Sequence, residues 1–100
     1  MMSIEKAYKT CIEMLYQRGY TDISRDDSEI TAINKDGNKM KCIYINDKIS
    51  TQNIRDIITS MDTEHIRHNI IIYEDEITTP AKKIIHDNKE NIIEMFNIKE

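Results

Sequence analysis

Glycine and proline are scarce in this sequence, and the shortage argues against several kinds of site. Gly19 and Gly37 are the only glycines among 100 residues. The chain therefore cannot form a glycine-rich loop that cradles phosphates, nor the tight glycine turn that presents a serine nucleophile. Nucleotide binding of the usual kinds and serine hydrolase chemistry are both disfavoured. The single proline, Pro80, leaves no proline-rich linker that could divide the chain.

Long apolar runs are also absent. No run approaches the roughly 18 residues that a bilayer crossing needs, and the N-terminus lacks the pattern of a signal peptide. We expect an intracellular, soluble protein without a membrane partner. Its two cysteines, Cys11 and Cys42, are far apart among apolar neighbours, which predicts buried free thiols instead of a disulfide or a metal pair.

Acidic residues outnumber basic ones, 18 against 14, which gives a net charge of -4. Proteins that hold nucleic acid alone neutralise its phosphates with an excess of lysine and arginine. Any contact with DNA should therefore be local and assisted by partners. One hundred residues bury only enough surface for one small core, so we expect a single domain over residues 1–100.

Apolar residues recur at helical spacing in three segments. Gly19 stands where a left-handed residue ends the first of these helices, and Ser50 is placed to cap the second. Thr79 followed by Pro80 resembles a cap and first turn, because proline lacks a donor that a helix start does not need. The predicted helices cover residues 3–18, 51–61 and 80–88.

β-Branched and aromatic residues mark the strands. Two strands flank Asp36-Gly37-Asn38, a turn sequence typical of a hairpin. An unbroken apolar run after the second helix predicts a central strand that is buried on both faces. The order of elements indicates an α/β fold, a three-layer sandwich on a mixed sheet. We predict strands over 29–34, 39–46 and 70–73, a loop over 21–28, and a short strand or last helical turn over 92–96.

Two histidines give a weak indication of a metal site. His65 and His68 are three residues apart, with Glu64 beside them, and a helix would place both imidazoles on one face. They fall in a predicted linker, however, and His86 lies far away in the sequence. We therefore expect solvated histidines, no resident metal and no cofactor.

A metal-dependent nuclease is the sharper enzymatic hypothesis. On a small α/β sandwich with a hairpin followed by βα units, two strands can present carboxylates and a lysine to a divalent ion. Such a site requires an acidic residue and a lysine at alternate positions of one strand. Lys39-Met40-Lys41 instead supplies two lysines and no acid. The sequence therefore favours a chain without catalytic residues, and a stand-alone nuclease or an unrelated protein-interaction domain is the alternative. The residues available for a nuclease site are Asp27, Glu29, Asp36 and Asp47, with Lys39 or Lys41.

Lys82 and Lys83 lie at the start of the third predicted helix, beside Thr79 and a set of backbone amides that could bind a phosphate oxygen. From these residues alone, a capped surface helix with solvated lysines is the favoured interpretation. The phosphate contact is the alternative.

Three short stretches carry a resemblance to a known family. They are residues 16–20, Tyr-Gln-Arg-Gly-Tyr at the end of the first helix, the isoleucine strand 70–73, and Thr79-Pro80-Ala81-Lys82 after an acidic turn. In this order and separation they resemble the N-terminal jaw domain of RNA polymerase subunit five, which the three eukaryotic nuclear polymerases share. The resemblance spans essentially the whole chain.

That resemblance implies a restriction-endonuclease-like sandwich without a catalytic site, in a non-enzymatic subunit of a DNA-directed RNA polymerase. Its partners would be the largest RNA polymerase subunit, the other polymerase subunits and downstream duplex DNA, with no small-molecule substrate. The family usually has one more small residue between the proline and the alanine of the Thr-Pro turn. The implied DNA contacts in the lower jaw are Thr79, Pro80, Ala81 and Lys82, with Lys83 beside them.

The family's C-terminal assembly domain would begin just after residue 100, so it is absent from this chain. The resemblance thus implies one domain of a longer subunit, a truncated copy, or a divergent form encoded by a large DNA virus. A cellular protein would be nuclear. A viral one would act in a virus factory, the infected-cell nucleus or the virion.

Overall fold

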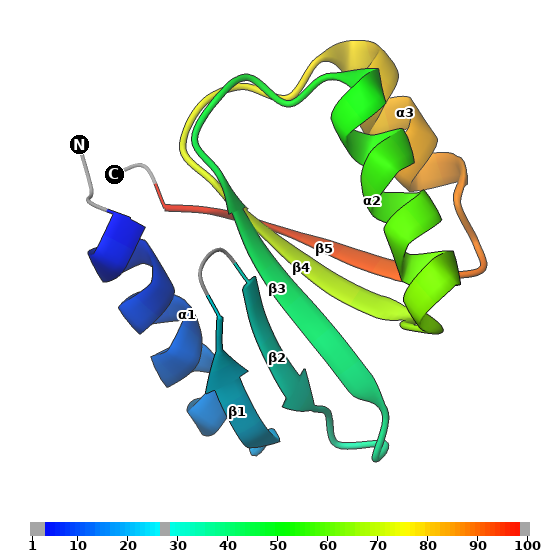
Figure 1. Cartoon of the computed structure of the whole chain (residues 1–100). Coiled ribbons are helices and arrows are strands. Elements are labelled where there is room, and N and C mark those ends of the chain that lie inside the picture. The colour runs from blue at the N-terminus through cyan, green and yellow to red at the C-terminus, as the bar shows by residue number, and fades with distance from the viewer. Residues whose placement is uncertain (1–3, 27–28, 99–100) are drawn as a thin grey trace.

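A five-stranded sheet separates one helix from two others in the computed structural model, which describes residues 4–26 and 29–98 (Figure 1). The strand order is β1-β2-β3-β4-β5, with the first three strands antiparallel and the last three parallel. This arrangement confirms the predicted three-layer α/β sandwich on a mixed sheet. The strands are β1 (Thr21–Arg25), β2 (Glu29–Ile33), β3 (Lys39–Ile45), β4 (His68–Tyr73) and β5 (Ile92–Asn97), and the helices are α1 (Ile4–Gln17), α2 (Thr51–Glu64) and α3 (Thr79–Asp87).

Each face of the sheet has its own hydrophobic core. On one face α1 packs on β2, β3 and β4, and both cysteines lie buried there as free thiols, as predicted. On the other face α2 and α3 pack on β3, β4 and β5. In β4, Ile70 and Ile72 belong to the first core and Ile71 to the second, which confirms a central strand buried on both faces.

The predicted ends of α1 and of the hairpin are confirmed. Gly19 has a φ of 81°, and its amide and that of Tyr20 bond back to carbonyls of the last turn of α1. Gly37 also has a φ of 81° in the turn between β2 and β3. In that turn the Asn34 side-chain oxygen accepts from the amides of Asp36 and Asn38, which fixes the orientation of the Asn34 amide.

The loop predicted over residues 21–28 is wrong, because residues 21–25 form β1 and pair with β2. β1 is an edge strand with a register shift between Thr21 and Ser24, and only Ile23 is partly buried. An exposed edge needs no alternation of apolar side chains, so the period that identifies a strand is missing. Residues 27 and 28 lie outside the described part of the chain.

The helix boundaries differ from the predictions in two places. α2 begins after its Ser50 cap as predicted, but it continues to Glu64, and His65 ends it with a φ of 58°. α3 is capped by Thr78, whose hydroxyl accepts from the Ala81 amide, so the predicted cap at Thr79 is wrong by one residue. Residues 92–97 form a strand and not a helical turn. No described helix is long and apolar enough to cross a membrane.

Candidate functional site

A buried lysine lies between two carboxylates on the face of the sheet that α2 covers. The Lys41 side chain is only 5% exposed, and its Nζ is 2.5 Å from Glu64 Oε2 and 3.4 Å from Glu29 Oε1. The side chains of Glu29 and Glu64 are 44% and 40% exposed. These three residues form the Lys41 cluster, a buried ammonium beneath two carboxylates that solvent reaches.

Three different elements supply the Lys41 cluster. Glu29 is the first residue of β2 and Glu64 is the last residue of α2. Lys41 lies in β3, where the alternation of side chains that buries Cys42 against α1 turns Lys41 to the opposite face. Ser60, one helical turn before Glu64, donates a hydrogen bond to the Glu64 carboxylate and holds it in place.

The charges of the Lys41 cluster reinforce one another. Burial lowers the pKa of Lys41, but the hydrogen bond to Glu64 and the nearby charge of Glu29 outweigh burial, so the pKa is raised above its ordinary value. Hydrogen bonds from Lys41 and Ser60 lower the pKa of Glu64. At neutral pH the cluster therefore contains an ammonium that keeps its proton. Lys41 can stabilise negative charge but cannot act as a base.

The two carboxylates offer oxygen ligands of the kind that Mg²⁺ prefers. Across residues 4–26 and 29–98, no group of three His, Cys, Asp or Glu side chains is arranged to hold a metal ion. Mg²⁺ is, however, commonly held by one or two carboxylates, waters and the phosphates of the substrate. Glu29 and Glu64 bond to Lys41 through one oxygen each. They fit a divalent cation that takes its remaining ligands from water and a phosphate.

Sequence reasoning identified two members of the cluster and missed the third. Glu29 and Lys41 were named as candidate pieces, and the structure brings them together. The acid that the strand lacks comes from α2, as Glu64. Its signal was the apolar stripe of α2, because Glu64 follows Met61 by three residues, close to the helix face that is buried. Of the other candidates, Asp36, Lys39 and Asp47 are exposed outside the cluster, and Asp27 lies outside the described residues.

The residues predicted to contact DNA lie at the other end of the sheet. α3 begins beyond the carboxyl end of β4, whereas Glu64 ends α2 shortly before the amino end of β4. Lys82 and Lys83 are exposed, and Lys83 pairs with Asp87 at 3.3 Å. The amides of Ala81 and Lys82 bond to the Thr78 hydroxyl and carbonyl, so they are already used within the chain. A DNA contact by Thr79, Pro80, Ala81, Lys82 and Lys83 stays a prediction.

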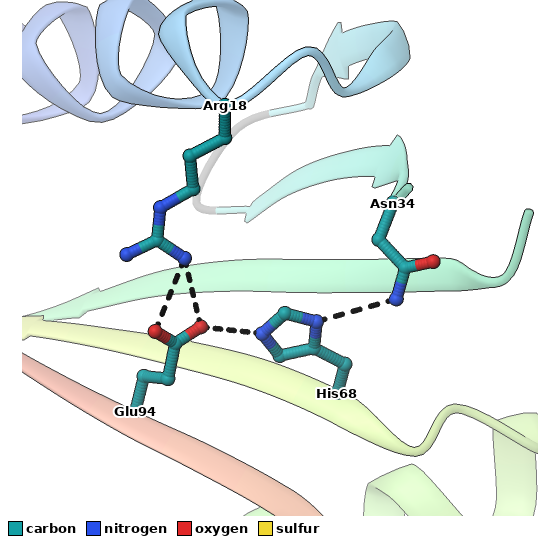
Figure 2. A network of polar contacts seen from close by, with 4 residues as sticks. All are labelled: Arg18, Asn34, His68 and Glu94. Carbon is teal, nitrogen blue, oxygen red and sulfur yellow. Dashed lines mark hydrogen bonds and ion pairs between the residues drawn. The ribbon is translucent and has the colours of Figure 1, made fainter. Parts of the chain in front are cut away.

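A second polar network lies on the α1 face of the sheet (Figure 2). Arg18 Nη1 donates to both oxygens of Glu94, at 3.1 and 2.9 Å, and His68 Nε2 is 2.5 Å from Glu94 Oε2. Asn34 Nδ2 lies 3.3 Å from His68 Nδ1. Because the Asn34 oxygen already accepts two backbone amides, its nitrogen faces His68 and donates. His68 thus lies between Asn34 and Glu94, with one ring nitrogen facing each.

The prediction of two solvated histidines is wrong for His68, which is 7% exposed. β4 begins two residues earlier than expected, so His68 lies in a strand and its side chain contacts Asn34 and Glu94. His65 is the exposed left-handed residue that ends α2. The two imidazoles do not share a face. The network joins the end of α1 to β5, and we assign it a structural function.

A fall in pH should weaken the ion pair between Arg18 and Glu94. Burial raises the pKa of Glu94, but hydrogen bonds from Arg18 and His68 outweigh burial, so the pKa is held below its ordinary value. A carboxylate of this kind stabilises the fold above its unfolded pKa and loses that contribution as the pH falls through its folded pKa. We expect the free energy of unfolding, from urea titrations at pH 7, 5 and 3, to fall less steeply in Glu94→Gln than in the wild type. Equal slopes for the two proteins would contradict this assignment.

The geometry of the sheet and its helices defines a fold class. The chain has a restriction-endonuclease-like fold. Neither a family model nor a curated protein matches its sequence. Among solved structures it is similar to a repair endonuclease from Pyrococcus abyssi, with a TM-score of 0.74 and 16% identity over 99% of this chain and 48% of that one. It is also similar to EndoMS in its apo form, with a TM-score of 0.60 and 13% identity over 92% of this chain and 46% of that one. The chain thus spans about half the length of these proteins.

These neighbours contradict the resemblance to RNA polymerase subunit five. Three predictions drawn from that resemblance are therefore also wrong. They are the transcription subunit, the polymerase partners and the absence of an enzymatic function. The physical reason lies in the stretches that carried the resemblance. Gly19 ends α1 and Pro80 lies in the first turn of α3, as the same residue types do in helices of unrelated folds. Glycine and proline at these positions mark the ends of helices in many folds, so they do not identify a family.

Proposed function

We propose that the chain is a nuclease domain that hydrolyses the phosphodiester backbone of DNA, with the Lys41 cluster as its catalytic site. The observation that supports this most is the buried ammonium of Lys41 between two carboxylates from β2 and α2. The fold is that of the repair endonucleases to which the chain is similar. This function was the alternative left open by the sequence, and Glu64 supplies the acid that the strand lacks.

The residues of the cluster divide the chemistry between them. In hydrolysis the oxygen of a water bonds to phosphorus, one P–O ester bond breaks, and the water's proton passes to the departing alkoxide. A divalent cation, when bound by Glu29 and Glu64, supplies charge stabilisation to the reacting phosphate and lowers the pKa of water. Lys41 keeps its proton, so its charge is available to the negative oxygens that develop in the transition state. The ammonium also holds the two carboxylates in their places.

The direct test is whether the purified chain cleaves supercoiled plasmid, linear duplex or single-stranded DNA. Because the neighbours are repair endonucleases, duplexes with a mismatch and branched junctions belong in the same panel. We expect cleavage of at least one form with Mg²⁺ or Mn²⁺, and none with EDTA. No cleavage of any form at high protein excess would contradict the proposal.

A matched pair of variants separates this activity from a contaminating nuclease. Glu64→Gln removes a charge from the Lys41 cluster and keeps the size of the side chain. Glu76→Gln makes the same change at an exposed position, where Glu76 pairs only loosely with Lys48 at 3.8 Å. Cleavage should be lost in the first variant and retained in the second. Equal cleavage by both variants would show that the Lys41 cluster is not the site.

A further inference from the structure

A buried amide beside the Lys41 cluster has an oxygen without a hydrogen-bond partner. Asn69 is 2% exposed, and its Oδ1 accepts no hydrogen bond from residues 4–26 or 29–98. It pairs with Lys41 in the parallel ladder between β3 and β4. Ile70 and Ile72 face α1, so Asn69 shares with Ile71 the face that α2 and α3 cover. Asn69 therefore lies next to Lys41 on the same face of the sheet.

The Lys41 ammonium has one donor that none of the described residues accepts. An ammonium carries three protons, and Lys41 donates to two acceptors, Glu29 and Glu64. Buried polar groups are nearly always paired, often through an ordered water. A cation cannot join an N–H to a carbonyl oxygen, whereas a water accepts from the first and donates to the second. Thr31, which pairs with Lys41 from β2, adds a hydroxyl to the same row.

We propose that Asn69 is a positioning residue for Lys41, and that one bound water accepts the third ammonium proton and donates to Asn69 Oδ1. A third acceptor then restricts the motion of the ammonium further than Glu29 and Glu64 do alone. The catalytic consequence rests on the proposed nuclease function, because a fixed ammonium meets the transition state without reorganising. The water bridge between Lys41 and Asn69 does not itself depend on that function.

The test uses two changes at Asn69 and one at a matched position. Asn69→Leu removes the acceptor at similar volume, and Asn69→Asp keeps an acceptor. Asn91 is the control, since it is 8% exposed and its Oδ1 is also unpartnered, but it precedes β5, two strands away from Lys41. Two measurements are made on each protein. They are the exchange rate of the Lys41 ammonium protons with water, by ¹H–¹⁵N NMR, and kcat and KM for the DNA form that the wild type cleaves.

We expect ammonium exchange about tenfold faster in Asn69→Leu, the factor that one hydrogen bond to a charged group represents. Exchange should stay near the wild-type rate in Asn69→Asp and Asn91→Leu. Asn69→Leu should also lower kcat about tenfold and leave KM unchanged. A wild-type exchange rate in Asn69→Leu, or equal acceleration in Asn91→Leu, would overturn the proposal. If the wild type cleaves no DNA but exchange responds as expected, the nuclease function fails and the bridge stands.

Discussion

Lys41→Met should abolish most DNA cleavage while the protein stays folded. The loss of one preorganised donor to the transition state lowers kcat by about 100- to 1000-fold in a well-studied hydrolase. Methionine fills a similar volume, and Glu29 and Glu64 are exposed enough to turn to solvent when the ammonium is gone. The free energy of unfolding should therefore fall by only about 1 kcal/mol, less than the ~3–5 kcal/mol lost when a fully buried ion pair is broken. Single-turnover cleavage and urea titration measure the two effects.

Lys39→Met is the matched control for this experiment. Lys39 lies two residues earlier on β3 and is exposed. Lys39 acts on Glu64 through its charge and not through a hydrogen bond, so its replacement should lower cleavage far less than that of Lys41. Activity within threefold of the wild type in Lys41→Met would rule out a catalytic function for the buried ammonium, whatever the stability.

Ile71→Ala should have the largest effect on stability. Ile71 is 0% exposed in the core that α2 and α3 form on the sheet, and it pairs with Ile43 on one side and Met95 on the other. Truncation of such a side chain costs about 3–4 kcal/mol, from lost apolar burial and from the cavity that remains. For a domain of this size the melting temperature should fall by about 15–25 °C. Calorimetry or thermal circular dichroism measures this directly.

Ile92→Ala tests whether burial is the cause. Ile92 lies on β5 and is 57% exposed, so its replacement should cost only about 0.5 kcal/mol. Comparable losses in Ile71→Ala and Ile92→Ala would contradict the burial of β4 between two helical layers.

Burial on both faces made β4 predictable from the sequence. The middle of a strand that is covered on both sides is apolar on both faces, and the run from Ile70 to Ile72 shows this without knowledge of any partner. The same logic located α1 and α2 through their apolar stripes. β1 was missed because an exposed edge strand imposes no such pattern, so only its pairing with β2 distinguishes it from a loop.

The candidate site was harder to predict because its residues meet through tertiary contacts. Glu64 lies 23 residues after Lys41 and in a polar stretch that reads as a linker. Its function depends on how far α2 extends and where that end docks on the sheet, and neither is a local property. His68 was misjudged for a similar reason, since a polar residue at the first position of a strand gives no sign of the carboxylate that it meets.

The three residues of the Lys41 cluster belong to parts of the fold that assemble at different stages of folding, which bears on the proposed activity. Glu29 and Lys41 belong to a hairpin closed by a short turn, whereas Glu64 reaches them only when α2 docks and the parallel half of the sheet is complete. Short loops close earlier than long crossovers, because closure entropy and folding time both grow with sequence separation. We expect a partly folded chain to hold the hairpin without the second acid. Nuclease activity would then appear only in the last step of refolding, and an incompletely folded chain would not cut DNA.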